Sequence, residues 1–252
     1  NTGKCTLHSE NSPRYSPIVF NTVESLSFDE VPLDVGHVRQ RKMRKIVLNF
    51  GMVASPPRNR RKSDMKFAYD AMYGAGMNAV KRLLPDATFL HCDNNPGFLG
   101  VAPEPIHRNL QEFSDLMIND NLDCGLATDG DADRIGLYDC DGNFIDSHHI
   151  ILLLIHYLVK YKGMKGKVVT AFSCSVKVKK ICQYYGLEHE TVQIGFKHIA
   201  GKMITEDILL GGEESGGIAT TGHIPERDGI WMGLILFEFM AISGKSLNDL
   251  IS

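Results

Sequence analysis

The sequence lacks several features that would place it in a specialised class of protein. Its apolar runs, such as that at residues 150–154, are far shorter than the ~20 residues that cross a bilayer, so we expect no membrane partner. Six cysteines occur without a CxxC pair, which disfavours a zinc site or disulfide framework and favours a reduced, cytoplasmic chain. A formal net charge of −3 and a single short basic run, 58–62, predict no nucleic-acid partner.

What the sequence does contain is enough apolar material for two domains. The chain has 252 residues, of which 43% are hydrophobic. Residues 1–64 are rich in Ser, Pro and Arg without sustained periodicity, so we predict an irregular segment there. From residue 65 onward, apolar runs alternate with helical segments. This alternation predicts two consecutive α/β/α three-layer domains, 65–162 and 163–252, with mixed, mostly parallel sheets.

The expected elements can be placed approximately along the chain. We predict strands at 66–72, 88–92, 123–128, 167–172, 191–194 and 207–211, and helices at 76–84, 108–117, 149–161, 196–204 and 229–242, with a further helix ending at 186. A hairpin is expected over 135–146, because Asp141-Gly142 suits a tight type I′ turn. Ligands of such domains collect at the carboxyl ends of parallel strands.

The stretch TDGDADRIG follows one of these strands and carries Asp129, Asp131 and Asp133. If the stretch is extended, alternate side chains point to the same face, so the three carboxylates converge. Oxygen ligands placed in this way suit Mg²⁺, and Arg134 adds a phosphate partner beside the metal. The alternative is a polar hairpin loop without a ligand.

Two later segments carry further candidates. In GGEESGG, glycines let the backbone approach a ligand while Glu213 and Ser215 can hold sugar hydroxyls; the alternative is a flexible surface loop. In GHIPERDG, His223 is either an acid or base or a capped loop residue near a helix start. Lys197, in GFKHI, follows a strand end and can reach an anionic ligand, although exposed lysines are common.

From about residue 65 to its end, the chain resembles the α-D-phosphohexomutase superfamily, the phosphoglucomutases and phosphomannomutases. The matching segments, in family order, are DAMYGAG, PEPI, TDGDADRIG, GFKHI, GGEESGG and GHIPERDG. The resemblance implies a second and a third domain in which the three aspartates hold Mg²⁺. It also implies that Glu213 and Ser215 hold sugar hydroxyls, and that Lys197, Arg134 and Arg227 position a phosphosugar.

Members of this family have four domains, and the first carries a serine that is phosphorylated in the active form. Residues 7–21, LHSENSPRYSPIVFN, align with that serine loop and place Ser9 at the phosphoserine position, so we interpret 1–64 as a remnant of the phosphoserine domain. Glu10 and Val19 stand where the family has histidine and lysine. A carboxylate beside a phosphoserine adds repulsion, and valine cannot transfer a proton.

Three hypotheses follow. The first is a phosphohexomutase that interconverts hexose 1-phosphate and hexose 6-phosphate, with Ser9, Arg134 and His223 as catalytic residues and with Mg²⁺ and a hexose 1,6-bisphosphate primer as cofactors. Glucose is favoured and mannose is the alternative. The sequence of the GGEESGG loop disfavours amino sugars. The second is a non-catalytic paralogue or fragment that binds Mg²⁺ and a phosphosugar. The third is a Mg²⁺-dependent phosphatase with Asp129 as nucleophile. The oligomeric state is left open.

Overall fold

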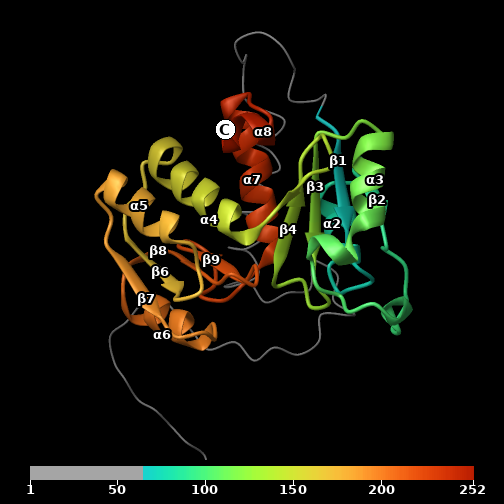
Figure 1. Ribbon diagram of the computed structural model, residues 1–252. Helices are drawn as coiled ribbons and strands as arrows, with labels where there is room; N and C mark the ends of the chain where they lie inside the picture. The colour runs from blue at the N-terminus through green and yellow to red at the C-terminus, as the bar shows by residue number, and fades with distance from the viewer. Residues whose placement is uncertain (1–64) are drawn as a thin grey trace, which may run out of the picture. The chain divides into compact units, whose positions relative to one another are not determined.

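The computed structural model describes residues 65–252 (Figure 1). The predicted irregular segment 1–64, including Ser9, Glu10 and Val19, lies outside the described residues.

The first sheet has the strand order β2-β1-β3-β4-β5. Its strands are β1 (Phe67–Asp70), β2 (Thr88–Leu90), β3 (Cys124–Thr128), β4 (Ile135–Tyr138) and β5 (Phe144–Ile145). The first three are parallel, so the ends of β1, β2 and β3 meet at one edge of the sheet. Strands β4 and β5 run antiparallel to their neighbours and form the predicted hairpin.

Side chains alternate between the two faces of this sheet. Ala68, Ala127 and Tyr138 pack in one cluster with α3 (Gln111–Asn119), whereas Tyr69 and Leu126 belong to the larger cluster on the opposite face. Helix α2 (Met77–Leu83) and two short 3-10 turns, Phe98–Gly100 and His107–Asn109, complete the segment between β1 and β3. The alternation is that of a sheet covered on both faces.

The second sheet has the order β7-β6-β8-β9. Its strands are β6 (Lys167–Ala171), β7 (His189–Val192), β8 (Ile208–Gly212) and β9 (Ile218–Thr220), and only β9 is antiparallel to its neighbour. Helix α6 (Lys197–Thr205) covers one face of this sheet, where its Ile199 lies in one cluster with Val169 of β6. Helix α5 (Val176–Tyr185) contributes Val178 to the larger cluster, which includes Val168 of β6.

Helix α7 (Gly229–Ser243) joins the two halves of the described chain. Its residues 229–241 are all buried, as expected for a helix that is apolar on every side. Although α7 follows the second sheet in sequence, Phe237 stacks on Phe67 of the first, with ring centroids 4.1 Å apart. Helix α4 (Ser147–His156), its π-helical extension (Tyr157–Tyr161) and α8 (Leu247–Ile251) lie in or beside the same cluster. Among residues 65–252, no helix combines the length and apolar character of a membrane span.

The predicted fold class is confirmed: the structure contains two α/β/α domains with mixed sheets. Strand β9 and helix α8 were not predicted. The predicted type I′ turn is wrong, because of its two central residues only Gly142 has a positive φ, at +73°. The turn instead spans Asp139 to Gly142, with the Gly142 N–H bonded to the Asp139 carbonyl at 3.2 Å. The domain boundary at residues 162 and 163 stays a prediction.

Candidate active site

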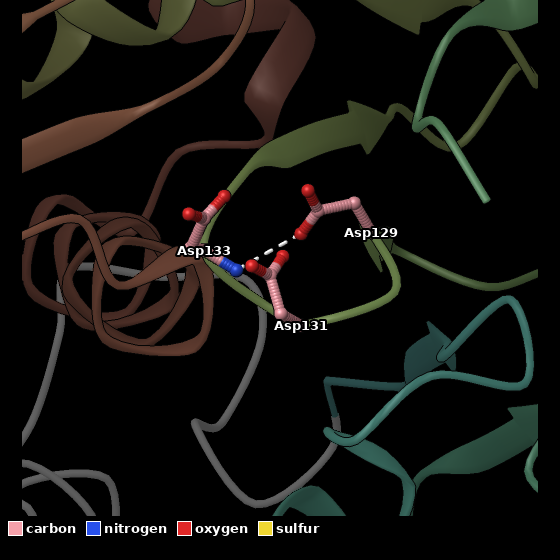
Figure 2. A group of neighbouring side chains, drawn as sticks. All are labelled: Asp129, Asp131 and Asp133. Atoms are coloured by element: carbon pink, nitrogen blue, oxygen red, sulfur yellow. Dashed lines mark hydrogen bonds between the residues drawn. The ribbon is translucent and has the colours of Figure 1, made fainter. Parts of the chain in front are cut away.

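The three aspartates of TDGDADRIG lie in a loop, residues 129–134, which we call the acidic loop. Each offers a carboxylate oxygen within 4.8 Å of the others (Figure 2). The predicted extended conformation is wrong. The loop is a tight turn in which the Ala132 N–H donates to the Asp129 carbonyl at 3.0 Å and Ala132 has a φ of +63°. The carboxylates therefore converge because the chain folds back, and not because a strand alternates.

Asp129 organises this loop from its buried position, 2% exposed. Its Oδ1 accepts hydrogen bonds from the backbone N–H groups of Asp133, at 2.9 Å, and Arg134, at 3.0 Å. Its Oδ2 accepts from Arg134 Nε at 2.6 Å. A buried carboxylate is stabilised by such charge-assisted bonds, so Asp129 determines the shape of the loop as well as contributing charge to it.

Asp133 and Asp131 are the two aspartates of the loop whose pKa values are raised. Asp133 Oδ2 pairs with Arg227 Nη2 at 2.6 Å, yet burial and the charge of Asp129 raise the pKa of Asp133 to about 7. Asp131 is exposed, and a partial loss of hydration together with the charge of Asp129 raises its pKa. Carboxylates that resist ionisation next to one another are stabilised by a further cation. A set of hard oxygen ligands of this size fits Mg²⁺.

The glycine-rich loop, residues 211–217, is closed by its own backbone. The Glu213 N–H donates to the Gly217 carbonyl at 2.9 Å, and the Gly216 N–H donates to the Glu213 carbonyl at 3.2 Å. Glu213 is 5% exposed and its Oε1 accepts from the Gly195 N–H at 2.7 Å, whereas Ser215 is exposed. These bonds favour a held loop over the flexible surface loop that the composition also allowed.

The acidic and glycine-rich loops are joined backbone to backbone. The Ile135 N–H donates to the Gly216 carbonyl at 3.2 Å, and Arg134 and Gly217 form an isolated antiparallel bridge. Gly216 has a φ of +96°, and a Cβ there would lie 2.7 Å from the Ile135 carbonyl oxygen, so the contact requires glycine. The start of α7 joins the same junction, because the Gly229 N–H donates to the Ala132 carbonyl at 3.0 Å.

His223 is held by the N-terminus of α7. Its side chain is 3% exposed, and its Nε2 lies 2.8 Å from Asp228 Oδ2. The imidazole also stacks on Trp231, with ring centroids 4.7 Å apart. Asp228 Oδ1 caps the helix by accepting from the Trp231 N–H at 2.9 Å. These are the contacts of the capped loop residue that the sequence offered as an alternative, and the catalytic role of His223 stays a prediction.

The predicted phosphosugar contacts lie around the same junction. The Arg227 guanidinium lies 5.5 Å from the centroid of the Phe196 ring. Lys197 is the next residue, exposed at the start of α6, and Gly195 on the other side binds Glu213. Every predicted site residue except Ser9, which lies outside the described residues, therefore belongs to or adjoins one connected set of loops.

Two parts of the junction were missed by reasoning from the sequence alone. Glu104, in the PEPI segment, lies 3.8 Å from Arg134 Nη1. The turn after β1 packs under the acidic loop: the Ala75 N–H donates to the Gly130 carbonyl at 2.9 Å, and a Cβ on Gly74 would lie 2.6 Å from the Asp129 carbonyl oxygen. The signal available in the sequence is the recurrence of glycine in DAMYGAG, a segment to which the resemblance assigned no role.

Comparison with known proteins finds a match for both parts of the chain. Residues 45–142 match the profile described as phosphoglucomutase/phosphomannomutase, alpha/beta/alpha domain II, and residues 146–252 match that of domain III. The chain belongs to the phosphoglucomutase/phosphomannomutase family. The predicted resemblance is thereby confirmed.

The chain matches part of the length of individual members of the phosphoglucomutase/phosphomannomutase family. It is 31% identical over 193 residues to the phosphoglucosamine mutase of Fusobacterium nucleatum subsp. nucleatum, covering 75% of this chain and 42% of that protein. The phosphoglucosamine mutase of Lactobacillus johnsonii is 28% identical, with 75% and 43% coverage. The chain thus spans less than half the length of these curated relatives.

Solved structures of the family share the fold. A Thermus thermophilus protein assigned as a phosphomannomutase superposes with a TM-score of 0.73 at 29% identity, covering 85% of this chain and 48% of that one. The N-acetylphosphoglucosamine mutase of Aspergillus fumigatus, solved with GlcNAc-6P and magnesium, has a TM-score of 0.60 at 16% identity, with 83% and 52% coverage. At that identity the second similarity concerns the fold alone.

Proposed function

We propose that this chain provides the metal-binding and sugar-binding parts of a phosphohexomutase that interconverts hexose 1-phosphate and hexose 6-phosphate. The observation that carries the proposal is the backbone junction between the acidic loop and the glycine-rich loop, at which Arg134 and Arg227 also lie. A phosphoryl transfer site needs cationic groups next to groups that hold the sugar. In this proposal residues 65–162 form the metal-binding domain and 163–252 the sugar-binding domain.

The acidic loop would hold Mg²⁺ through Asp129, Asp131 and Asp133. Bound there, Mg²⁺ supplies electrostatic stabilisation for the negative charge of a transferring phosphoryl group. The two guanidinium groups at the loop can each offer two parallel N–H donors to a phosphate, and Lys197 adds a point charge. Arg134 and Arg227 would therefore orient the phosphosugar.

The remaining roles concern the sugar and the proton. The exposed hydroxyl of Ser215 and the carboxylate of Glu213 would exchange hydrogen bonds with sugar hydroxyls. The Nε2 atom of His223 is bonded to Asp228 Oδ2 at 2.8 Å, so His223 would exchange a proton at its other ring nitrogen, Nδ1. Ser9, outside the described residues, would carry the phosphoryl group, with a hexose 1,6-bisphosphate as primer.

The identity of the sugar is proposed at the level of the hexose phosphates. Glucose remains the favoured substrate and mannose the alternative. The curated relatives named above are phosphoglucosamine mutases. Glucosamine phosphates therefore belong in the same assay. A reduced, cytoplasmic setting stays part of the proposal, on the lack of a CxxC pair in the sequence.

The decisive experiment is a mutase assay primed with glucose 1,6-bisphosphate, using the 1-phosphates of glucose, mannose and glucosamine, with intact-mass analysis for one bound phosphate. Turnover that Ser9→Ala and Asp131→Asn abolish, but that Asp86→Asn at an exposed turn retains, would support the mutase. Mg²⁺-dependent phosphosugar binding without turnover would support the non-catalytic paralogue. Phosphate trapped on Asp129 would support the phosphatase, which the structure disfavours because both oxygens of that buried carboxylate already accept hydrogen bonds.

A further inference from the structure

Three residues near the acidic loop hold an unusual backbone conformation. Met72, Tyr73 and His91 have φ values of +47°, +61° and +48°. This left-handed region is rarely adopted by residues other than glycine, and residues that adopt it are retained where the surrounding structure enforces the conformation. All three follow the parallel strands β1 and β2, at the edge of the sheet where β3 leads into the acidic loop.

One buried carboxylate connects these residues. Asp70 is 0% exposed, and its Oδ1 accepts from the Met72 N–H at 2.7 Å. The Nδ1 atom of His91 lies 3.1 and 3.0 Å from the two Asp70 oxygens, and its Nε2 lies 3.3 Å from Glu112 on α3. The hydrogen bond with Asp70 raises the pKa of His91, which favours a charged pair at this position. The ends of β1 and β2 are thus fastened together by a charge-assisted bond.

The backbone of this region continues the connection. The Tyr73 N–H donates to the His91 carbonyl at 2.9 Å, and the two rings lie 4.8 Å apart. Residues 72–76, which we call the supporting turn, therefore have their conformation determined from both strands. Neither Asp70 nor His91 contacts the three aspartates of the acidic loop in the hydrogen bonds and ion pairs of residues 65–252.

The supporting turn packs against the acidic loop at two points. The Ala75 N–H donates to the Gly130 carbonyl at 2.9 Å. Gly74 approaches so closely that a Cβ would lie 2.6 Å from the Asp129 carbonyl oxygen and 2.8 Å from that of Gly130. Backbone atoms cannot move aside as the end of a flexible side chain can, so a displacement of the turn would displace the loop.

We propose that Asp70 and His91 are positioning residues for the acidic loop, because they hold the supporting turn in the conformation against which Asp129 and Gly130 pack. The inference rests on the proposed function, in which this loop holds Mg²⁺. Partners that orient metal ligands without binding the metal commonly change metal affinity about 10–100-fold when replaced. Here the orientation is transmitted through a strained backbone.

The test is isothermal titration of MgCl₂ into the chain and its variants. Asp70→Asn and Gly74→Ala are each expected to raise the Mg²⁺ dissociation constant about tenfold. Gly74→Ala changes no charge, so its effect cannot come from a weaker electrostatic attraction. Matched controls are Glu238→Gln, which alters a buried carboxylate bonded to Tyr157, and Gly201→Ala, where a Cβ meets nothing within 4 Å. Both controls should retain the affinity of the parent.

A double variant distinguishes positioning from a general loss of stability. If Asp70→Asn and Gly74→Ala act through the same turn, their combined effect on the dissociation constant will be smaller than the product of the single effects. Urea denaturation identifies any variant that is not folded, and where Asp70→Asn is not folded, His91→Gln, which removes the other member of the pair, takes its place. A parent that binds Mg²⁺ while both folded variants bind it equally well would overturn this inference alone. A parent that binds no Mg²⁺ would overturn the proposed function and the inference with it.

Discussion

Replacing Arg227 with methionine is expected to tighten Mg²⁺ binding and to weaken phosphosugar binding. The Arg227 guanidinium pairs with Asp133 at 2.6 Å, so it occupies a carboxylate that the metal would share. The aliphatic part of the side chain packs on Gly217, where a Cβ would lie 2.5 Å from Arg227 Cδ, and methionine can retain that contact. The substitution therefore removes the charge with little loss of packing.

The size of the effect follows from the exposure of the pair. An exposed ion pair contributes about 0–1 kcal/mol, and breaking a fully buried one costs about 3–5 kcal/mol. The side chains of Arg227 and Asp133 are 30% and 16% exposed, so their interaction lies between these limits. We take ~1.4 kcal/mol, which corresponds to a tenfold lower Mg²⁺ dissociation constant. A loss of similar size is expected for glucose 1-phosphate, because a charge-assisted donor is removed.

Calorimetric titration with MgCl₂ and with glucose 1-phosphate measures both effects. The titrations should be run at about pH 8, because Arg227 lowers the pKa of Asp133 and its removal would let protons compete with the metal near neutrality. Lys180→Met, on the exposed surface of α5, is the control for losing one positive charge elsewhere. Equal Mg²⁺ affinities for Arg227→Met and the parent, or a gain matched by Lys180→Met, would refute the reasoning.

Three further substitutions test the fold by urea denaturation. Gly211→Ala would place a Cβ against Ile199 of α6 and should lower the free energy of unfolding by about 1–3 kcal/mol. Gly201→Ala, where a Cβ meets open space, should not lower it. Equal free energies of unfolding for the two variants would contradict this packing. Asp228→Ala removes the N-cap of α7 and should cost about 1–2 kcal/mol, largely restored by Asn. The pKa of His91 in the folded chain is raised above its ordinary value of 6.5. The stabilisation of the folded state by His91 is therefore complete below pH 6.5 and is lost as the pH rises through the folded pKa. His91→Gln should remove this dependence, and an unchanged pH profile would count against the pair.

Local patterns were sufficient for most elements of the fold. The run KVVTAF predicted a buried strand, and β6 occupies Lys167–Ala171 with four of its five residues buried. The helix predicted over 229–242 is α7, Gly229–Ser243. Its packing on Phe67 of the first sheet could not be predicted, because a helix that is apolar all round shows no preferred face. Such contacts depend on which surface the rest of the chain leaves uncovered.

The candidate site contains conformations that could not be predicted from the neighbouring sequence. The convergence of the three aspartates was predicted from an extended strand, and it arises from a turn with Ala132 at a φ of +63°. That conformation is stabilised by Gly229, which donates to the Ala132 carbonyl from far along the sequence. The turn at Asp141-Gly142 differs for a local reason: Asp139 Oδ1 accepts from the N–H groups of Asp141 and Asn143, which favours a side-chain-bonded turn over type I′.

The ion pairs of the acidic loop link the two binding events that the proposed function requires. Arg134 donates through Nε to Asp129, and Arg227 Nη2 forms an ion pair with Asp133 at 2.6 Å, so both guanidinium groups are engaged with carboxylates. A divalent cation that shares Asp133 weakens its hold on Arg227 and frees a donor for the phosphosugar. Linkage then requires that the phosphosugar raise the affinity for the cation by the same factor. In the proposed function, the carboxylate cluster would therefore bind the metal and also control substrate binding, because the arginines paired with it are the groups expected to bind the phosphosugar.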